Sequence, residues 1–271
     1  MMISSPSNPH LKAIRKLNDA KERNATGNFL AEGLRVVGQA VDSDANIVEL
    51  LWSDEFLISD YGRSLISQLS KNPSIEISEL SREAFESLAR KDKPQGIAAV
   101  IRQEWHFLEK QQALENGLWV ALEAVQNPGN LGTILRTCDA VGAKGLILLD
   151  NSTDPYDPAA IKASMGAIFT IPLYKSNVEG LQTFLALNPA MQTIGTSDKV
   201  NQDCFEFDYP DPLLLMMGSE REGLSQYYMD LCQNMISIPM EGQNDSLNLS
   251  VATGVMLYQI YNHHRKAKQH D

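Results

Sequence analysis

Three polar segments of this 271-residue chain combine side chains that could bind and orient a polar ligand. The segments are Asn127–Thr137, Gly218–Leu224, and Ile238–Gly242 continuing into Ser246–Ala252. Between them they carry two amides, a carboxylate, a hydroxyl and a guanidinium, which belong to Asn130, Asn248, Glu220, Ser246 and Arg136. Such groups can hold a charged or hydroxylated substrate through directed hydrogen bonds.

Each segment also has a purely structural interpretation. Asn127 and Pro128 are typical of the start of a helix, and Ser246 or Asn248 could cap the last helix of the chain. Acidic residues in Gly218–Leu224 would complement a helix dipole. Taken singly, these segments therefore do not distinguish a functional site from ordinary helix capping.

The three segments follow short, nearly continuous apolar runs. The runs in this half of the chain are Trp119–Leu122, Gly145–Leu149, Thr193–Gly195, Leu213–Met217 and Met235–Ile238. Strands that are apolar throughout are typical of parallel sheets buried on both faces, and the stretches between these runs have helical periodicity. The pattern predicts a doubly wound α/β domain, in which ligands bind beyond the carboxyl ends of the strands.

The N-terminal part of the chain predicts a separate, smaller α/β domain. Its strand-like runs are Ile47–Leu51, Ile75–Ile77 and Ile97–Ile101, and helical patterns lie between them. The polar stretch after this domain ends in the turn signal Asn116–Gly117. We therefore expect a first domain over residues 1–100, a linker over 101–117 and a second domain over 118–271.

Composition limits the class of protein. No apolar run approaches the length of a membrane span or of a signal peptide, so we expect a soluble, cytoplasmic protein. The three cysteines, Cys138, Cys204 and Cys232, have no metal-ligand or disulfide spacing, so we expect neither a metal site nor a disulfide framework. The net charge of −11 argues against nucleic-acid binding over the whole surface.

The charge distribution nevertheless leaves room for an RNA contact. Residues 1–35 hold six basic and three acidic side chains, and residues 263–268 form a second basic patch. Lys12, Arg15, Lys16, Arg23 and Arg35 are the candidate RNA contacts in the first of these regions.

Together, the three segments resemble the signature motifs of the SpoU/TrmH family of RNA ribose methyltransferases in the SPOUT superfamily. The motif Asn-x-x-Asn-x-Gly-x-x-x-Arg begins at Asn127, and Ser-Leu-Asn-Leu-Ser begins at Ser246. Residues 8–12, 32–33 and 94–100 resemble the ribosomal-protein-like substrate-binding domain of the same family. The resemblance covers nearly the whole chain.

The resemblance implies a fold, a cofactor and partners. The expected fold is a trefoil-knotted parallel-sheet catalytic domain preceded by a small α/β RNA-binding domain, and the expected assembly is a homodimer. The expected cofactor is S-adenosyl-L-methionine (SAM). By analogy with the family, SAM would be held at Thr196, Met217, Gly218, Ile238, Met240 and Leu247.

The same resemblance assigns roles to the polar side chains. Arg136 would lie beside the ribose 2′-hydroxyl, Asn130 and Glu220 would position groups around it, and Ser246 and Asn248 would complete the polar ring. A guanidinium is a poor proton acceptor, because its pKa lies above about 12. We favour an Arg136 that anchors the adjacent phosphate while a phosphate oxygen or water takes the proton, but the sequence leaves both roles open.

Two positions depart from the family pattern. Lys162 stands where arginine is common, so a positive charge is kept for RNA but the planar fork is lost. Ser219 stands where asparagine is frequent.

Two other functions remain open at this stage. One is an inactive RNA-binding protein of the same fold, which the five polar side chains at their family spacings argue against. The other is a SAM-dependent enzyme acting on a small molecule or protein, which the acidic pI of about 4.9 would suit. The additional N-terminal domain favours 23S-type rRNA over tRNA as the substrate.

Overall fold

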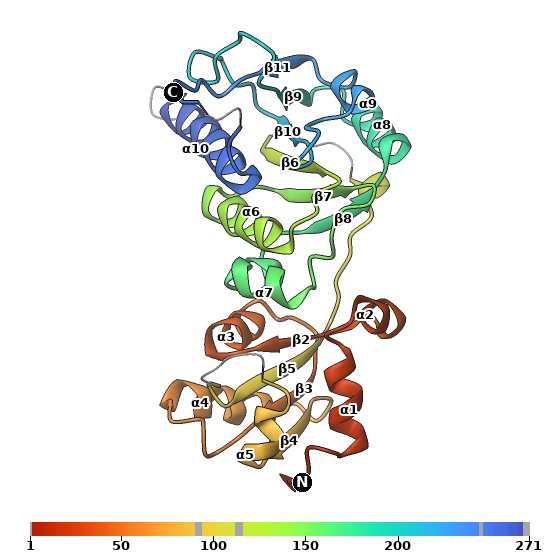
Figure 1. Cartoon of the computed structure of the whole chain (residues 1–271), viewed down its shortest axis with the longest axis vertical. Helices are drawn as coiled ribbons and strands as arrows, with labels where there is room; N and C mark the ends of the chain where they lie inside the picture. The colour runs from red at the N-terminus through yellow and green to blue at the C-terminus, as the bar shows by residue number, and fades with distance from the viewer. Residues whose placement is uncertain (1, 90–93, 112–115, 244–245, 268–271) are drawn as a thin grey trace. The chain divides into compact units, whose positions relative to one another are not determined.

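The computed structural model describes residues 2–89, 94–111, 116–243 and 246–267, and they form two compact units (Figure 1). Unit 1 comprises Met1–Glu104 together with Asp154–Thr170, and unit 2 comprises Trp105–Thr153 and Ile171–Asp271. The chain therefore leaves unit 1, returns to it for a short segment, and leaves it again.

Unit 1 is built on a mixed five-stranded sheet of order β1-β4-β3-β5-β2. The pairs β1/β4 and β3/β4 are parallel, whereas β5 runs antiparallel to both β3 and β2. The strands are β1 (Met2–Ile3), β2 (Asn28–Glu32), β3 (Ile47–Trp52), β4 (Glu76–Leu80) and β5 (Ile97–Arg102). The helices are α1 (Pro9–Lys16), α2 (Ala20–Thr26), α3 (Leu34–Asp42), α4 (Asp60–Leu69) and α5 (Arg82–Glu86).

Local sequence explains how α1 is placed on this sheet. The side chain of Asn8 accepts a hydrogen bond from the backbone N–H of His10, and proline occupies the first turn, which together fix the helix start. Leu11 and Ile14 lie on one face of α1 and, with Leu17, are buried against the sheet.

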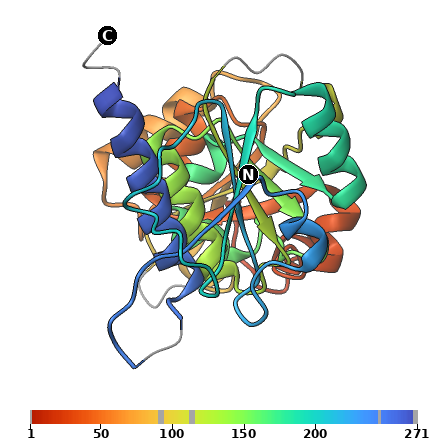
Figure 2. The same cartoon turned by 90° about the horizontal axis from the view of Figure 1, so that it is seen from above.

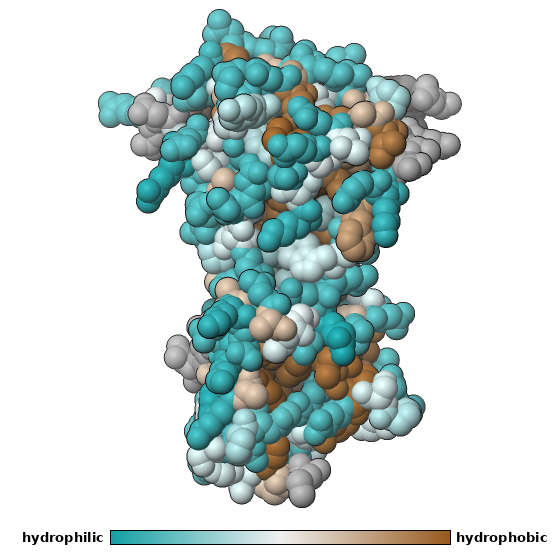
Figure 3. All heavy atoms as spheres, turned by 90° about the vertical axis from the view of Figure 1, so that its right-hand side faces the viewer, coloured by the Kyte–Doolittle hydropathy of each residue, from teal (hydrophilic) through white to brown (hydrophobic). Residues whose placement is uncertain are grey.

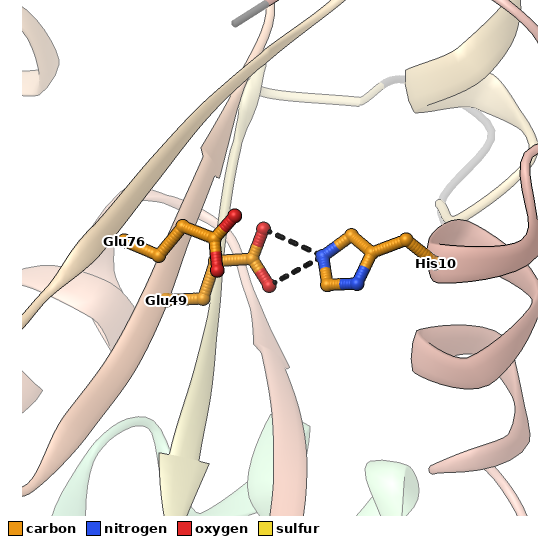
Figure 4. A group of neighbouring side chains, drawn as sticks. All are labelled: His10, Glu49 and Glu76. Atoms are coloured by element: carbon orange, nitrogen blue, oxygen red, sulfur yellow. Dashed lines mark hydrogen bonds and ion pairs between the residues drawn. The ribbon is translucent and has the colours of Figure 1, made fainter.

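A polar contact joins the same helix to the sheet. His10 Nε2 lies 2.8 Å from Oε2 of Glu49, a buried carboxylate on β3 that also accepts a hydrogen bond from the hydroxyl of Ser78 at 2.6 Å. Figure 4 shows Glu76, which is directly opposite Glu49 on β4, beside this pair. The ligand atoms of His10, Glu49 and Glu76 lie within 4.8 Å of one another, so these three are the side chains of unit 1 that could hold a metal ion. The short distance between His10 and Glu49 is already that of a hydrogen bond.

The segment 154–170 belongs to unit 1 through a buried ion pair. Arg23 is only 1% exposed, and its guanidinium contacts Asp154 at 2.7 Å and Asp157 at 3.6 Å. It also donates to the backbone carbonyls of Leu17 and Asn18. This network anchors α7 (Pro158–Ser164) and the short helix η2 (Ala167–Phe169), which follow Asp157.

Unit 2 is built on a six-stranded sheet of order β11-β9-β10-β6-β7-β8, in which all neighbours are parallel. The strands are β6 (Leu118–Glu123), β7 (Gly145–Leu149), β8 (Leu173–Ser176), β9 (Gln192–Thr196), β10 (Leu213–Met217) and β11 (Asn234–Ile236). The helices are η1 (Leu108–Lys110), α6 (Pro128–Val141), α8 (Val178–Leu187), α9 (Gln226–Met229) and α10 (Leu249–Ala267).

Both faces of this sheet are covered. In Figure 1, α6 and α10 lie on one face and α8 and α9 on the other, and Figure 2 shows α10 running alongside α6. Trp119 and Ala121 of β6 pack in the same core cluster as Phe184 of α8, which explains why β6 is apolar at every position except its last.

Strand order locates the place where a ligand would bind. From β6 the chain first builds outward through β7 and β8, and the later strands β9, β10 and β11 lie on the opposite side of β6. The order reverses between β6 and β10, and ligands of open α/β sheets bind beyond the carboxyl ends of the strands at such a point.

The structure adds elements that the sequence patterns do not indicate. The polar stretch 101–117 begins inside β5, and its Leu108, on η1, is 1% exposed in the core of unit 2. Strand β8 is short and half polar, and α2 carries only polar and small residues, so neither has a clear hydrophobic period. Among the described helices, none has the length and hydropathy of a membrane span.

Replacing Arg23 with Ala should destabilise unit 1 by about 3 kcal/mol, because it leaves a carboxylate and two carbonyls without their buried partner. Urea unfolding followed by circular dichroism measures this loss. Lys21→Ala, on the exposed side of the same helix, is the matched control and should change stability by no more than about 0.5 kcal/mol. Equal stabilities for the two variants would show that the ion pair does not hold the segment.

Candidate active site

A cavity of about 400 Å³ opens at the carboxyl ends of β9, β10 and β11. Its walls come from segments that are distant in sequence: residues 196–199, residues 217–224, Met229 on α9, and Ile238, Met240, Ser246 and Leu247 together with Leu249 and Ala252 on α10. The residues that the family resemblance assigns to SAM all line it: Thr196, Met217, Gly218, Ile238, Met240 and Leu247. The cavity shares the loop after β10 with the point where the strand order reverses, but none of its lining residues comes from the loop after β6.

A chain of hydrogen bonds ties the loop after β10 to α6 and α10. Glu220 Oε1 accepts from the side-chain amide of Asn130 at 3.0 Å and from the backbone N–H of Asn127 at 3.1 Å. Glu220 Oε2 accepts from the backbone N–H of Gln126 at 3.0 Å. The Asn130 oxygen in turn accepts from the amide of Asn248 at 3.2 Å. We refer to these contacts as the Glu220–Asn130–Asn248 network.

The network also caps two helices. The side-chain oxygen of Asn127 accepts from the N–H groups of Gly129 and Asn130 in the first turn of α6. The side-chain oxygen of Asn248 accepts from the N–H of Ser250 at the start of α10. The structural and functional interpretations of these asparagines are therefore compatible. Asn130 and Asn248 do not themselves line the cavity, and they act on it through Glu220, which does.

Glu220 is held as a carboxylate. Burial alone would raise its pKa, but the hydrogen bonds from Gln126, Asn130 and Asn127 outweigh burial and keep the pKa below its ordinary value. Its position at the start of α6 also places negative charge against the positive end of that helix. A carboxylate so engaged is a positioning group rather than a proton acceptor.

The loop after β10 folds back on itself. Ser219 and Gly223 exchange two backbone hydrogen bonds, and Gly223 has a φ of +70°. A Cβ at Gly218 would collide with the backbone of Gly223 and Leu224, so only glycine fits the start of this turn. The turn brings Glu220 to the mouth of the cavity.

Two contacts among four further residues hold the end of this loop, and the sequence motifs did not single these residues out. The N–H of Ser225 donates to Oε2 of buried Glu123 at 2.7 Å, and the hydroxyl of Tyr228 donates to Asp150 at 2.8 Å. Burial, reinforced by that hydrogen bond, raises the pKa of Tyr228, so the hydroxyl stays a donor. Acidic residues at the ends of the apolar strands β6 and β7 are the signal by which Glu123 and Asp150 could be found.

The other predicted catalytic residues are placed differently. Ser246 is exposed and lines the cavity. Arg136 is exposed on α6, does not line the cavity of its own chain, and has no hydrogen bond or ion pair among the described residues. Asp198 and Lys199 line the cavity although no motif indicated them, and Arg221, which belongs to the segment Gly218–Leu224, also lines it.

Some of the side chains predicted to contact RNA are exposed, whereas others are engaged in contacts within the protein. Lys12, Lys16, Arg35 and Lys162 are exposed, with Lys162 on α7 of unit 1. Arg15 is half-buried and donates to Ser87 and to the carbonyl of Pro6. Arg23 cannot be the RNA contact that its charge suggests, because the ion pair with Asp154 buries its guanidinium.

Family models match both parts of the chain. The SpoU rRNA Methylase family model matches residues 117–258, which is more than half of the chain, and the MRM3-like substrate binding domain model matches residues 8–99. The chain belongs to the SpoU rRNA methylase family.

Known proteins of this family resemble the chain over nearly its full length. The 23S rRNA (uridine(2479)-2'-O)-methyltransferase of Streptomyces viridochromogenes is 30% identical over 90% of this chain and 85% of that protein. The 23S rRNA (guanosine(2553)-2'-O)-methyltransferase RlmP of Bacillus subtilis is 29% identical over 95% of this chain and 98% of that protein.

A solved structure agrees. The AdoMet-bound rRNA methyltransferase from Sinorhizobium meliloti is 33% identical, covers 97% of this chain and 98% of its own, and has a TM-score of 0.87. The family and the α/β fold predicted from the motifs are confirmed.

Replacing Glu220 with Gln should weaken the network, because one acceptor oxygen becomes an N–H₂ donor that faces the N–H of Gln126 or Asn127. We expect SAM affinity, measured by calorimetric titration, to fall about tenfold, since a hydrogen bond to a charged group contributes about 1.5–3 kcal/mol. Glu206→Gln, exposed and outside the cavity, is the control and should bind SAM like the parent protein. Unchanged SAM affinity in the Glu220 variant would show that the network does not contribute to SAM binding.

The same network predicts a pH dependence. Because the pKa of Glu220 is lowered in the folded chain, its stabilisation is present above the ordinary carboxyl value of 4.5 and is lost as the pH falls through the lowered pKa. The stability difference between the parent protein and the Glu220→Gln variant should therefore shrink in acid, which thermal unfolding at pH 7 and below pH 4.5 would measure.

Proposed function

We propose that the chain transfers a methyl group from SAM to a ribose 2′-hydroxyl of structured RNA, with 23S-type rRNA favoured over tRNA. The observation that carries this proposal is the cavity lined by all six expected cofactor residues and bordered by Glu220 and Ser246. The relatives named as 23S rRNA 2'-O-methyltransferases, which align over nearly the whole chain, support the rRNA substrate. An rRNA substrate accords with a cytoplasmic protein.

The cavity suits SAM in size, and its walls combine apolar and charged side chains, as a cofactor with an aromatic base and charged groups requires. Ligand cavities typically measure about 300–1,000 Å³, with mostly apolar walls and a few polar groups. Met217, Ile238 and Leu247 offer apolar surface for an adenine, and Gly218 leaves its backbone open to a ligand. When bound, SAM supplies an electrophilic methyl group on a sulfonium.

The protein's own groups orient the acceptor. The Glu220–Asn130–Asn248 network fixes the loop and the two helix starts around the cavity, so the 2′-hydroxyl meets a preorganised polar surface. Arg136 would anchor the neighbouring phosphate through its planar fork, and a phosphate oxygen or water would take the proton.

A homodimer is part of this proposal. On α10, Leu249, Met256, Leu257 and Ile260 are buried, whereas Val251, Tyr258 and Tyr261 leave 51%, 53% and 38% of their surface exposed. On the face of unit 2 that carries α8 and α9, hydrophilic side chains predominate and apolar groups are scattered (Figure 3). The exposed apolar residues of α10 would pair with those of a second copy. Each copy would then present its Arg136 to the cavity of the other copy.

The trefoil knot also belongs to the proposal. The adjacent cavity walls from the loops after β9, β10 and β11 support it. In the knotted arrangement the last loop would thread behind the others, and Ile238, Met240 and Leu247 would hold SAM from that side.

Light scattering at micromolar concentration should give twice the chain mass of 30.1 kDa. The double variant Val251→Glu with Tyr258→Glu should give the monomer mass, because it places charge in the apolar interface. Tyr227→Glu, at a site 75% exposed on α9, is the control and should remain dimeric. A monomeric parent protein would refute the dimer.

Arg136→Ala should reduce single-turnover methylation about 10²–10⁴-fold while leaving SAM affinity nearly unchanged, because Arg136 lies outside the cavity lining. Arg136→Lys should restore little activity, since a point charge cannot reproduce a bidentate fork. Tritiated SAM with rRNA measures the transfer, and calorimetry measures SAM binding. Near-normal turnover in the alanine variant would make Arg136 an ordinary solvated helix residue.

Mapping 2′-O-methyl positions in total RNA from a deletion strain tests the substrate. Loss of one rRNA methyl group supports the proposal, and loss of a tRNA methyl group would correct the substrate class. If no position loses its methyl group while the protein still binds RNA, the inactive RNA-binding alternative holds instead.

A further inference from the structure

A second cavity, also of about 400 Å³, lies entirely within unit 1. It is formed where β2, the loop between α3 and β3, and the residues after β5 meet the segment 154–170. No motif of the family resemblance falls on its lining residues, and it shares no residue with the cavity of unit 2.

One side of this cavity is aromatic. The Phe29 ring centroid lies 4.8 Å from that of Tyr156 and 6.2 Å from that of Phe169, whose ring is nearly parallel to it at 25°. Phe29 and Tyr156 are buried and support the aromatic side of the cavity, whereas Phe169 is partly exposed and offers an accessible ring. The hydroxyl of Tyr156 is fixed by the backbone of Glu104, to which it donates at 2.6 Å.

The other side is polar. Asn46 and Arg102 are exposed, and neither side chain has a hydrogen bond or ion pair among the described residues. Asp44 and Glu104, which each bring a carboxyl group, also line the cavity. Two carboxylates against one guanidinium disfavour a phosphate inside, so the chemistry suits a neutral ring with hydrogen-bond donors.

We propose that this cavity binds one unstacked nucleobase of the RNA substrate, a base that carries an exocyclic amino group. The inference rests on the proposed function, since it takes the substrate to be RNA. Proteins recognise single-stranded RNA by placing splayed bases against aromatic rings and hydrogen-bonding their edges. Asn46 offers the donor and acceptor pair that matches adenine, and the carboxylates can accept from an amino group.

Uracil is the base that the cavity fits least well. It has no amino group, and its two carbonyl oxygens would face the carboxylates of Asp44 and Glu104. Arg102, at the rim, is placed to contact the backbone of the same nucleotide while the base lies within.

The full-length protein with fluorescein-labelled RNA hexamers of adenosine, cytidine or uridine tests the site by fluorescence anisotropy. We expect the adenosine and cytidine hexamers to bind more tightly than the uridine hexamer. Asn46→Ala should weaken binding of the adenosine hexamer about tenfold, since one base contact contributes about 1–3 kcal/mol. Arg102→Ala should weaken binding of all three hexamers, because it removes a contact to the nucleotide backbone. SAM affinity should not change.

Two variants of unit 1 outside the cavity are matched controls. At exposed positions, Asn24→Ala removes the same side-chain type as Asn46→Ala, and Lys71→Ala removes a positive charge as Arg102→Ala does; both controls should bind the hexamers like the parent protein. Thermal unfolding verifies that all four variants fold. In methylation assays with rRNA, the cavity variants should raise KM for RNA and leave kcat unchanged.

The outcomes separate this site from the proposed activity. Methyl transfer to rRNA together with equal hexamer binding by the cavity variants and the controls would overturn the base site alone. Equal affinity for the uridine hexamer, or no hexamer binding by the parent protein, would overturn it as well. Hexamer binding that depends on Asn46 and Arg102, without methyl transfer to any RNA, would leave the site standing and refute the activity.

Discussion

The carboxylate of Glu220 at the start of α6 is the contact on which the geometry of the site depends. It accepts hydrogen bonds from three donors of the segment 126–130, so it fixes the loop after β10 against the loop after β6. These two strands are neighbours at the point where the strand order reverses. Glu220 therefore joins the two loops directly through hydrogen bonds.

The rest of the site is built outward from that bridge. Asn130 also accepts a hydrogen bond from Asn248, which precedes α10. At the other end of the loop after β10, Ser225 donates to Glu123 and Tyr228 donates to Asp150. Most of these contacts join a side chain to a backbone N–H or to another fixed side chain. The loop after β10 is therefore held in place before a ligand binds, which lowers the entropic cost of association.

Much of this arrangement could be predicted from sequence, for physical reasons. Apolar runs such as Leu213–Met217 are buried on both faces and therefore stand out, and Asn130, Glu220 and Asn248 are recognisable because a family motif fixes their spacing. The sequence could not show which charged side chains are buried in ion pairs and which are exposed. Arg23 and the exposed Lys12 look alike in sequence, but Arg23 meets Asp154, 131 positions further along the chain, and is buried. The burial of Leu108 was not predictable either, because a single apolar residue in a polar stretch gives no periodic signal.

The return of residues 154–170 to unit 1 has a topological consequence. The polypeptide passes between the two units three times, after Glu104, after Thr153 and after Thr170. No single cut can therefore release an intact unit. A fragment that ends before Trp105 would lack Asp154 and Asp157, whose carboxylates pair with the buried guanidinium of Arg23. The complementary fragment would carry the segment 154–170 without the rest of the unit to which it belongs, so neither half should be as stable alone as it is in the intact chain.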